Sequence, residues 1–167
     1  MMKILIAYLS ESGNTEKLAK AIFEGIESSE KEIVSIKDVS GTEGYDIIFI
    51  GFPVQSHSMP IKVEAFAKNL PDGQKVAYFA THGSMRGGEM AVTAFHHAIT
   101  VSNNAEILGS YGCRGQVKQS IIDSLLQKPE HRGWALEAQG AAGHPDAADL
   151  EDGKDWARKM ITKARAR

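Results

Sequence analysis

Short apolar runs alternate with segments of helical periodicity along this chain, and the alternation is what most constrains its fold. Five runs stand out: Ile4–Leu9, Ile33–Ile36, Ile47–Gly51, Val76–Ala80 and Ile107–Tyr111. The first, third and fourth are nearly unbroken, as expected for strands that are covered on both faces of a parallel sheet. The runs are therefore predicted to be β-strands.

The segments between these runs carry apolar residues at helical spacing. Thr15–Ile26 places Leu18 and Ile22 on one stripe and its charged residues elsewhere. Pro60–Leu70 and Glu89–Thr100 repeat the pattern, and a proline suits a first helical turn. Strand and helix thus alternate, which predicts an α/β fold with a doubly wound parallel sheet and helices on both faces.

The last third of the chain is less regular. Gln116–Gln127 is predicted to be helical, Pro129–Gly143 has no decisive pattern, and Asp146–Arg167 is predicted to be a closing helix with basic last turns. The Ala/Gly-rich stretch Ala138–Gly143 is interpreted as a loop between two helices rather than a domain boundary. With 167 residues, the chain is predicted to form a single domain, residues 1–167.

Composition excludes several classes of protein. The 19 Lys and Arg against 21 Asp and Glu give a net charge of −2, so a nucleic-acid partner is not expected. The single cysteine, Cys113, rules out an intrachain disulfide, indicates a cytoplasmic location and is expected to be structural. No apolar run is long enough for a signal-peptide core or a membrane span, so no membrane association is expected.

The loop after the first apolar run is rich in hydrogen-bond donors. Ser10–Thr15 joins the first predicted strand to a helix, whose first N–H groups have no intrahelical partner and favour an anion. The loop has neither the three fixed glycines of a dinucleotide fingerprint nor the Gly-Lys of a P-loop. A site for one terminal phosphate and an ordinary capped helix both remain open interpretations of these residues.

Two further loops follow the third and fourth predicted strands. Gly51–Pro60 is a long polar turn bracketed by prolines, and Thr81–Glu89 contains three glycines, which allow the backbone to approach a flat ligand closely. In doubly wound sheets, ligands bind beyond the carboxyl ends of the strands. We therefore expect the three loops to form one binding site.

At these positions the sequence resembles the flavodoxin family. The match consists of the strand Lys3–Leu9, the hydroxyl-x-hydroxyl-Gly-Asn-Thr pattern at Ser10–Thr15, the loop start Gly51–Pro53 and the acidic entry to the last helix at His144–Leu150. The resemblance implies a five-stranded parallel sheet in the order 2-1-3-4-5, with FMN at the tips of the first, third and fourth strands. It also implies redox partner proteins, a reductase and an acceptor, and a monomer or weak homo-oligomer.

The family's site residues fall on the three loops. The resemblance implies that the phosphate is held by Ser10, Ser12, Gly13, Asn14 and Thr15. It implies that the isoalloxazine ring is flanked by two further sets, Pro53, Val54, Gln55, Ser56, His57 and Ser58, and Thr81, His82, Gly83, Met85, Gly87 and Gly88. No catalytic residue and no metal ligand is expected.

Two departures from the family pattern keep alternatives open. Flavodoxins usually stack a tryptophan or similar group and a tyrosine on the ring, whereas these loops contain no such aromatic besides Phe52 and histidines. The glycine that flavodoxins commonly place beside the flavin N5 is also missing from Pro53–Pro60. The first hypothesis is an electron carrier, and the second is an FMN-dependent NAD(P)H oxidoreductase for quinones or similar acceptors. The third is a binding module that has lost the flavin.

Overall fold

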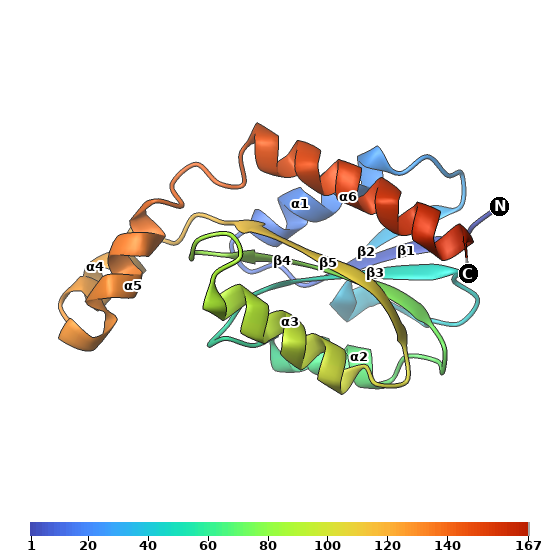
Figure 1. Cartoon of the computed structure of the whole chain (residues 1–167), viewed down its shortest axis with the longest axis horizontal. Helices are drawn as coiled ribbons and strands as arrows, with labels where there is room; N and C mark the ends of the chain where they lie inside the picture. The colour runs from blue at the N-terminus through green and yellow to red at the C-terminus, as the bar shows by residue number, and fades with distance from the viewer. Residues whose placement is uncertain (167) are drawn as a thin grey trace.

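The computed structural model describes residues 1–166 and consists of a parallel β-sheet between two layers of helices (Figure 1). The strands are β1 (Ile4–Tyr8), β2 (Lys31–Ser35), β3 (Ile47–Pro53), β4 (Lys75–His82) and β5 (Glu106–Arg114). They are ordered β2-β1-β3-β4-β5, and every pairing is parallel. The predicted fold class and the strand order implied by the flavodoxin resemblance are confirmed.

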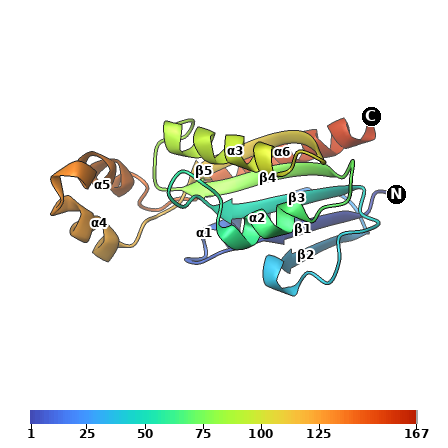
Figure 2. The same cartoon turned by 90° about the horizontal axis from the view of Figure 1, so that it is seen from below.

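The helices divide between the two faces of the sheet and one of its ends. They are α1 (Asn14–Gly25), α2 (Ile61–Lys68), α3 (Glu89–Val101), α4 (Gln119–Leu126), α5 (Arg132–Gln139) and α6 (Ala147–Arg165). The pair α1 and α6 covers one face, and α2 and α3 cover the other (Figures 1 and 2). Within residues 1–166, no helix combines the length and the apolar character needed to cross a membrane.

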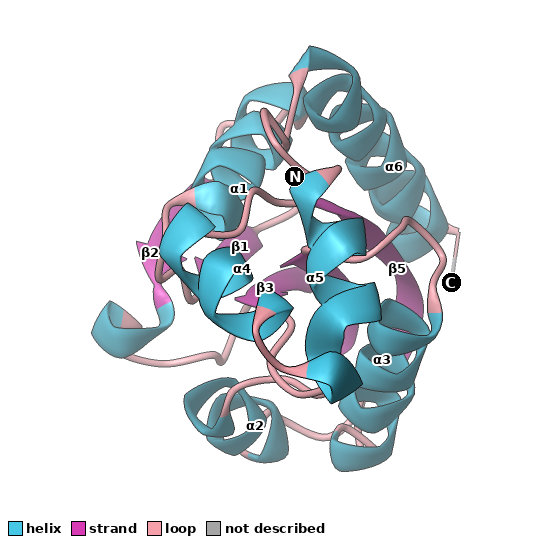
Figure 3. Ribbon diagram, turned by 90° about the vertical axis from the view of Figure 1, so that its left-hand side faces the viewer, coloured by secondary structure: helices cyan, strands magenta, loops and turns pink. Residues whose placement is uncertain are grey.

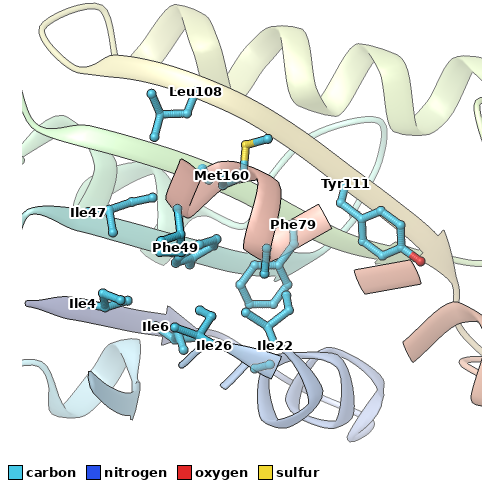
Figure 4. Packing of buried hydrophobic residues seen from close by; sticks show 14 of the residues in the cluster. Ile4, Ile6, Ile22, Ile26, Ile47, Phe49, Phe79, Leu108, Tyr111 and Met160 are labelled. Atoms are coloured by element: carbon cyan, nitrogen blue, oxygen red, sulfur yellow. The ribbon is translucent and has the colours of Figure 1, made fainter. Parts of the chain in front are cut away.

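The core is two-sided because successive strand residues point to opposite faces. Ile4 and Ile6 of β1 lie with Phe49 and Phe79 in the cluster under α1 and α6 (Figure 4). Leu5 of β1 belongs to the other cluster, under α2 and α3. Both faces of the central strands are therefore buried, which explains why their sequences are apolar without alternation.

Element boundaries differ from the predicted ones mainly at the edge strands. β2 covers Lys31–Ser35, and Ile36 opens a 3₁₀ turn at Ile36–Asp38. β5 runs on to Arg114 because its residues stay paired with β4 as far as His82, so Cys113 lies within this strand rather than after it. An edge strand has a neighbour on one side only, so the apolar run in its sequence predicts its two ends less accurately than in a central strand.

The segment Pro129–Gly143, which has no decisive sequence pattern, forms the second half of a helical hairpin whose first half is α4. It contains a 3₁₀ turn at Pro129–His131, followed by α5, which packs against α4. We call residues 117–143 the cap. The cap has a small core of its own, in which Ile122, Ala135 and Ala138 are buried, and it lies beyond the carboxyl ends of the strands (Figure 3).

A pair of isoleucine substitutions tests this packing. Ile22 of α1 is 0% exposed within the cluster that contains Phe79, whereas Ile61 of α2 is 84% exposed. Ile22→Ala is expected to lower the free energy of unfolding by about 2–5 kcal/mol, because it leaves a cavity in the core. Ile61→Ala is expected to change it by less than about 0.5 kcal/mol. Urea unfolding followed by circular dichroism measures both, and equal losses would contradict the packing described here.

Candidate functional site

The turn between β1 and α1 presents free backbone donors. Gly13 has a φ of 96°, a left-handed conformation that glycine adopts without strain. The hydroxyl of Ser10 accepts hydrogen bonds of 3.2 Å from the N–H groups of Gly13 and Glu16. Within residues 1–166, the N–H groups of Ser12, Asn14 and Thr15 have no protein acceptor. These donors at a helix N-terminus form a site suited to an anion.

Two of the side chains that the resemblance assigned to the phosphate, those of Asn14 and Thr15, also tie this turn to the rest of the site. The hydroxyls of Thr15 and Thr81 lie 2.8 Å apart in a buried contact, which joins the turn to the end of β4. The Asn14 amide nitrogen donates to the carbonyl of Gln116 at 3.0 Å, next to the start of the cap. The backbone of the turn is thereby fixed, and its N–H groups remain available.

The loop after β3 forms a tight turn without glycine. Gln55 and Ser58 exchange backbone hydrogen bonds of 2.8 and 2.9 Å. Between them, Ser56 and His57 have φ values of 48° and 63°, as in the primed turns of hairpins. Both side chains are exposed at the tip. The missing glycine therefore does not prevent left-handed backbone here, although each such residue costs about 1 kcal/mol or more.

The same loop is anchored to the helices beneath it. The Ser58 hydroxyl lies 2.5 Å from Nδ1 of His97 on α3. Nε2 of His97 is 3.7 Å from a carboxylate oxygen of Glu64 on α2. Ser58 is thus part of the support of the loop.

The loop after β4 leaves the site beyond Ser84, where its residues Met85 and Arg86 turn toward α5 and α6. Met85 donates its N–H to the Glu137 carboxylate on α5 at 2.6 Å. The Arg86 guanidinium pairs with Asp152 at 2.9 Å and lies 5.0 Å from the centroid of the Tyr111 ring. The guanidinium therefore faces α6 rather than a ligand on the three loops.

A cavity of about 300 Å³ lies where the loops converge. Of the residues that the resemblance implied, eight line it: Ser12, Asn14, Pro53, Val54, Gln55, Thr81, His82 and Gly83. Ser10, Gly13 and Thr15 do not line the cavity but belong to the turn between β1 and α1, residues 10–15, which we call the phosphate turn. Outside the lining are Ser56, His57, Ser58, Met85, Gly87 and Gly88. A larger cavity of about 390 Å³, beside Met1 and Arg165, lacks such a convergence of loops.

Half of the cavity wall comes from residues that sequence reasoning did not single out. They are Glu11, Met90, Gly115, Gln116, Val117, Lys118, Ile121 and Trp134. Most belong to the end of β5 and the cap. One signal was available: in a parallel sheet the fifth strand ends at the same edge as the others, so the segment after it also reaches the site.

Two lysine side chains lie beside the phosphate turn. The sequence of the loop itself predicted only neutral donors around a bound phosphate. A second cavity, of about 380 Å³, is lined by Lys17 and Lys118 together with Ser12 and Asn14. The Lys17 ammonium donates to the carbonyl of Pro145 at 2.9 Å. The electrostatic environment therefore favours a phosphate more strongly than the loop residues alone.

The residues at this edge fit FMN. Free N–H groups at the start of α1 suit its phosphate, and the apolar side chains of Pro53 and Val54 line the cavity where a flat ring would lie. A cavity of about 300 Å³ is at the lower end of the range typical of small-ligand sites. This arrangement binds and orients a ligand.

Two other groups that could carry chemistry have structural roles. Burial raises the pKa of the Cys113 thiol to about 12, so it stays protonated and unreactive at neutral pH. His144, Asp146 and Asp149 lie close enough to hold a metal ion. However, Asp146 and Asp149 form the capping box of α6, and Asp149 also accepts from His144 at 2.5 Å. Capping explains this cluster without a metal.

His82 is a buried histidine in the cavity wall. Its Nδ1 lies 3.1 Å from the carbonyl of Ser84, and its Nε2 is buried without a hydrogen-bond partner among the described residues. Burial lowers the pKa of His82 below its ordinary value. The folded protein therefore holds His82 neutral, with the proton on Nδ1.

This burial predicts a pH dependence of stability. Below the unfolded-state pKa of about 6.5, the unfolded chain binds a proton that the folded chain excludes. The free energy of unfolding should therefore decrease as the pH falls from 7.5 to 5, by up to about 1.4 kcal/mol per pH unit from this group. His82→Gln should reduce the slope, and His96→Gln, an exposed control on α3, should keep it. Urea unfolding at several pH values measures the slope of the free energy of unfolding against pH. Identical slopes for the original protein and His82→Gln would refute the role of His82.

Known proteins share this fold and this sequence pattern. The Flavodoxin-like domain-containing protein BilS of Clostridioides difficile (strain CD3) is 27% identical over 175 residues, which cover 98% of each chain. An archaeal flavodoxin superposes with a TM-score of 0.64 at 19% identity, over 98% of this chain and 99% of the other. A flavoprotein from Lactobacillus acidophilus NCFM, solved in complex with FMN, gives 0.56 at 20% identity, over 74% and 98%.

The similarity to the two solved structures shows the fold, and the match to a family model shows the family. The family model of the flavodoxin domain matches residues 5–158, which include most of β1, the phosphate turn, the loops after β3 and β4 (the ring loops) and most of α6. With its strand order and its phosphate turn, the chain thus belongs to the flavodoxin domain family.

Proposed function

We propose that this protein binds FMN and carries electrons between a reductase and an acceptor protein. The observation that carries the proposal is the convergence of the phosphate turn and both ring loops on one cavity. Family membership supports FMN as the ligand of that cavity. The FMN complex of the Lactobacillus acidophilus flavoprotein supports the same ligand by similarity of fold.

Each part of the site has a distinct role in this proposal. The N–H groups of Ser12, Asn14 and Thr15 hold the phosphate, with Lys17 and Lys118 adding charge nearby. Pro53 and Val54, which line the cavity, would contact the ring and exclude water from it. FMN, when bound, supplies the redox chemistry, while the protein supplies binding, orientation and electrostatics.

The proposal includes partners and location. The partners are redox proteins rather than nucleic acid, since the net charge of −2 gives no polyanion-binding character. The protein acts in the cytoplasm, as a monomer or weak homo-oligomer. A single buried thiol is compatible with a reducing compartment.

The phosphate predicts a pH dependence of FMN affinity. Its second pKa is about 6, so it is a dianion at pH 8 and largely a monoanion at pH 5. The N–H groups and lysines attract the dianion more strongly, so FMN should bind more weakly at pH 5 than at pH 8. Riboflavin, which lacks the phosphate, is the control. Fluorescence titration measures both flavins, and an FMN affinity that stays constant from pH 5 to 8 would contradict this phosphate site.

Stepwise anaerobic reduction of the FMN-loaded protein, followed by visible absorbance, tests the carrier function. A carrier is expected to take up electrons singly, which gives a long-wavelength absorbance band that rises and then falls. Direct conversion to the fully reduced flavin would contradict this expectation. Steady oxidation of NADPH with a quinone by the protein alone would favour the oxidoreductase hypothesis instead.

A further inference from the structure

The cap closes the side of the cavity that the three loops leave open. Val117 and Lys118 at its start, Ile121 on α4 and Trp134 on α5 all line the cavity. In the end-on view, α4 and α5 lie in front of the carboxyl ends of the strands (Figure 3). Whatever occupies the cavity therefore contacts the cap as well as the loops.

Trp134 is packed against the loop that follows β4. A Cβ atom placed on Gly83 would lie 3.4 Å from Cζ2 of Trp134 and 2.5 Å from Cγ2 of Val117. The cap therefore fits this closely only because Gly83 has no side chain. Among the residues that line the cavity, Trp134 is the only one with an indole or phenyl ring.

Two hydrogen bonds of Glu137 hold α5, and with it Trp134, in place. Glu137 lies one turn after Trp134 on the helix, so the two residues share a face. Its carboxylate accepts from the Met85 N–H at 2.6 Å, and its carbonyl accepts from the Arg114 guanidinium at 2.7 Å. These bonds fix α5 to the ends of β4 and β5, and with it the ring of Trp134.

The base of the cap is also held together. Gln116 donates its N–H to the carbonyl of His144 at 2.8 Å, and its side-chain oxygen accepts from the Gly143 N–H at 2.9 Å. The carbonyl of Gln116 accepts from Asn14 of the phosphate turn. The cap is thus joined directly to the phosphate turn, and its position relative to the cavity is defined at both ends.

Trp134 also has a property that a residue serving only the cap core would not need. Its Nε1 is buried without a hydrogen-bond partner among the described residues. A buried donor without an acceptor lowers the stability of the folded protein, and a leucine at this position would avoid that loss. The neighbouring Ile122, Leu125 and Leu126 already fill the cap core with aliphatic side chains.

We propose that Trp134 is a flavin-binding residue, supplied by the cap in place of the stacking aromatics that the loops after β3 and β4 lack. This inference rests on the proposed function and names the group that contacts the isoalloxazine ring. Lys118, at the start of the same cap, lines both the ring cavity and the cavity beside the phosphate turn. The cap would therefore lie beside both the ring and the phosphate of the ligand.

Substitution of the two tryptophans tests the inference, because the chain contains two, Trp134 and Trp156. Trp156 packs in the core against Phe49 and Tyr111, away from the cavity. Indole rings in contact with flavin quench its fluorescence by electron donation. In Trp134→Leu, bound FMN is expected to regain emission and to bind about tenfold more weakly, the loss typical of one aromatic contact. Trp156→Phe is expected to keep the quenching and the affinity of the original protein.

A second control separates contact with the ring from stability of the cap. Leu126→Ala removes a half-buried side chain from the cap core, and Leu126 is not among the residues that line the cavity. It should lower the thermal stability while FMN affinity and quenching persist. If Trp134→Leu does not fold by circular dichroism, Trp134→Phe replaces it. Phenylalanine can stack but does not donate an electron to excited flavin, so emission should rise while affinity falls by less than about threefold.

The outcomes separate this inference from the proposed function. If the original protein does not bind FMN, the proposed function fails. If it binds FMN and the Trp134 variants keep both the affinity and the quenching, the role of Trp134 is overturned and the function stands. Loss of quenching in the Trp134 variants but not in Trp156→Phe or Leu126→Ala supports the inference.

Discussion

The candidate site depends on the parallel pairing of β1, β3 and β4. Their residues are buried on both faces, so polar side chains are excluded from the body of the sheet and appear where each strand ends. Parallel pairing then brings these ends to one edge. The buried contact between the hydroxyls of Thr15 and Thr81 joins the phosphate turn to β4 at this edge, so core packing and site geometry are linked.

The features that lower the stability of the folded protein are concentrated at the same edge of the sheet. The buried side-chain nitrogen and oxygen atoms without a hydrogen-bond partner in residues 1–166 are Nε2 of His82, Nε of Arg114 and Nε1 of Trp134. All three residues lie at the carboxyl ends of β4 and β5 or on the cap that covers them. Ser56 and His57 add left-handed backbone in the loop after β3. Unpartnered polar atoms and local strain of this kind are typical of sites shaped for a ligand rather than for stability.

The cap changes how the departures from the flavodoxin pattern should be interpreted. Viewed as loops alone, Gly51–Pro60 and Thr81–Glu89 lack ring-stacking aromatics, which suggests an exposed flavin face. In the folded protein, Trp134 and Ile121 lie on the side of the cavity that those loops leave open. The small Gly83 then has a packing role, because it admits Val117 and Trp134.

The sequence by itself determined the fold class, the central strands and the phosphate turn, because these depend on local patterns. Unbroken apolar runs specify two-sided burial, and Ser10–Thr15 places a tight turn before a helix. Only the tertiary structure decided which loop residues reach the cavity and that the ambiguous segment Pro129–Gly143 contributes to its wall. The contact of Trp134 with Gly83 joins segments far apart in the chain, and no local periodicity encodes it. Contacts of the cap with Gly83, Met85 and Arg114 place that indole, and one sequence contains no signal for such a pairing.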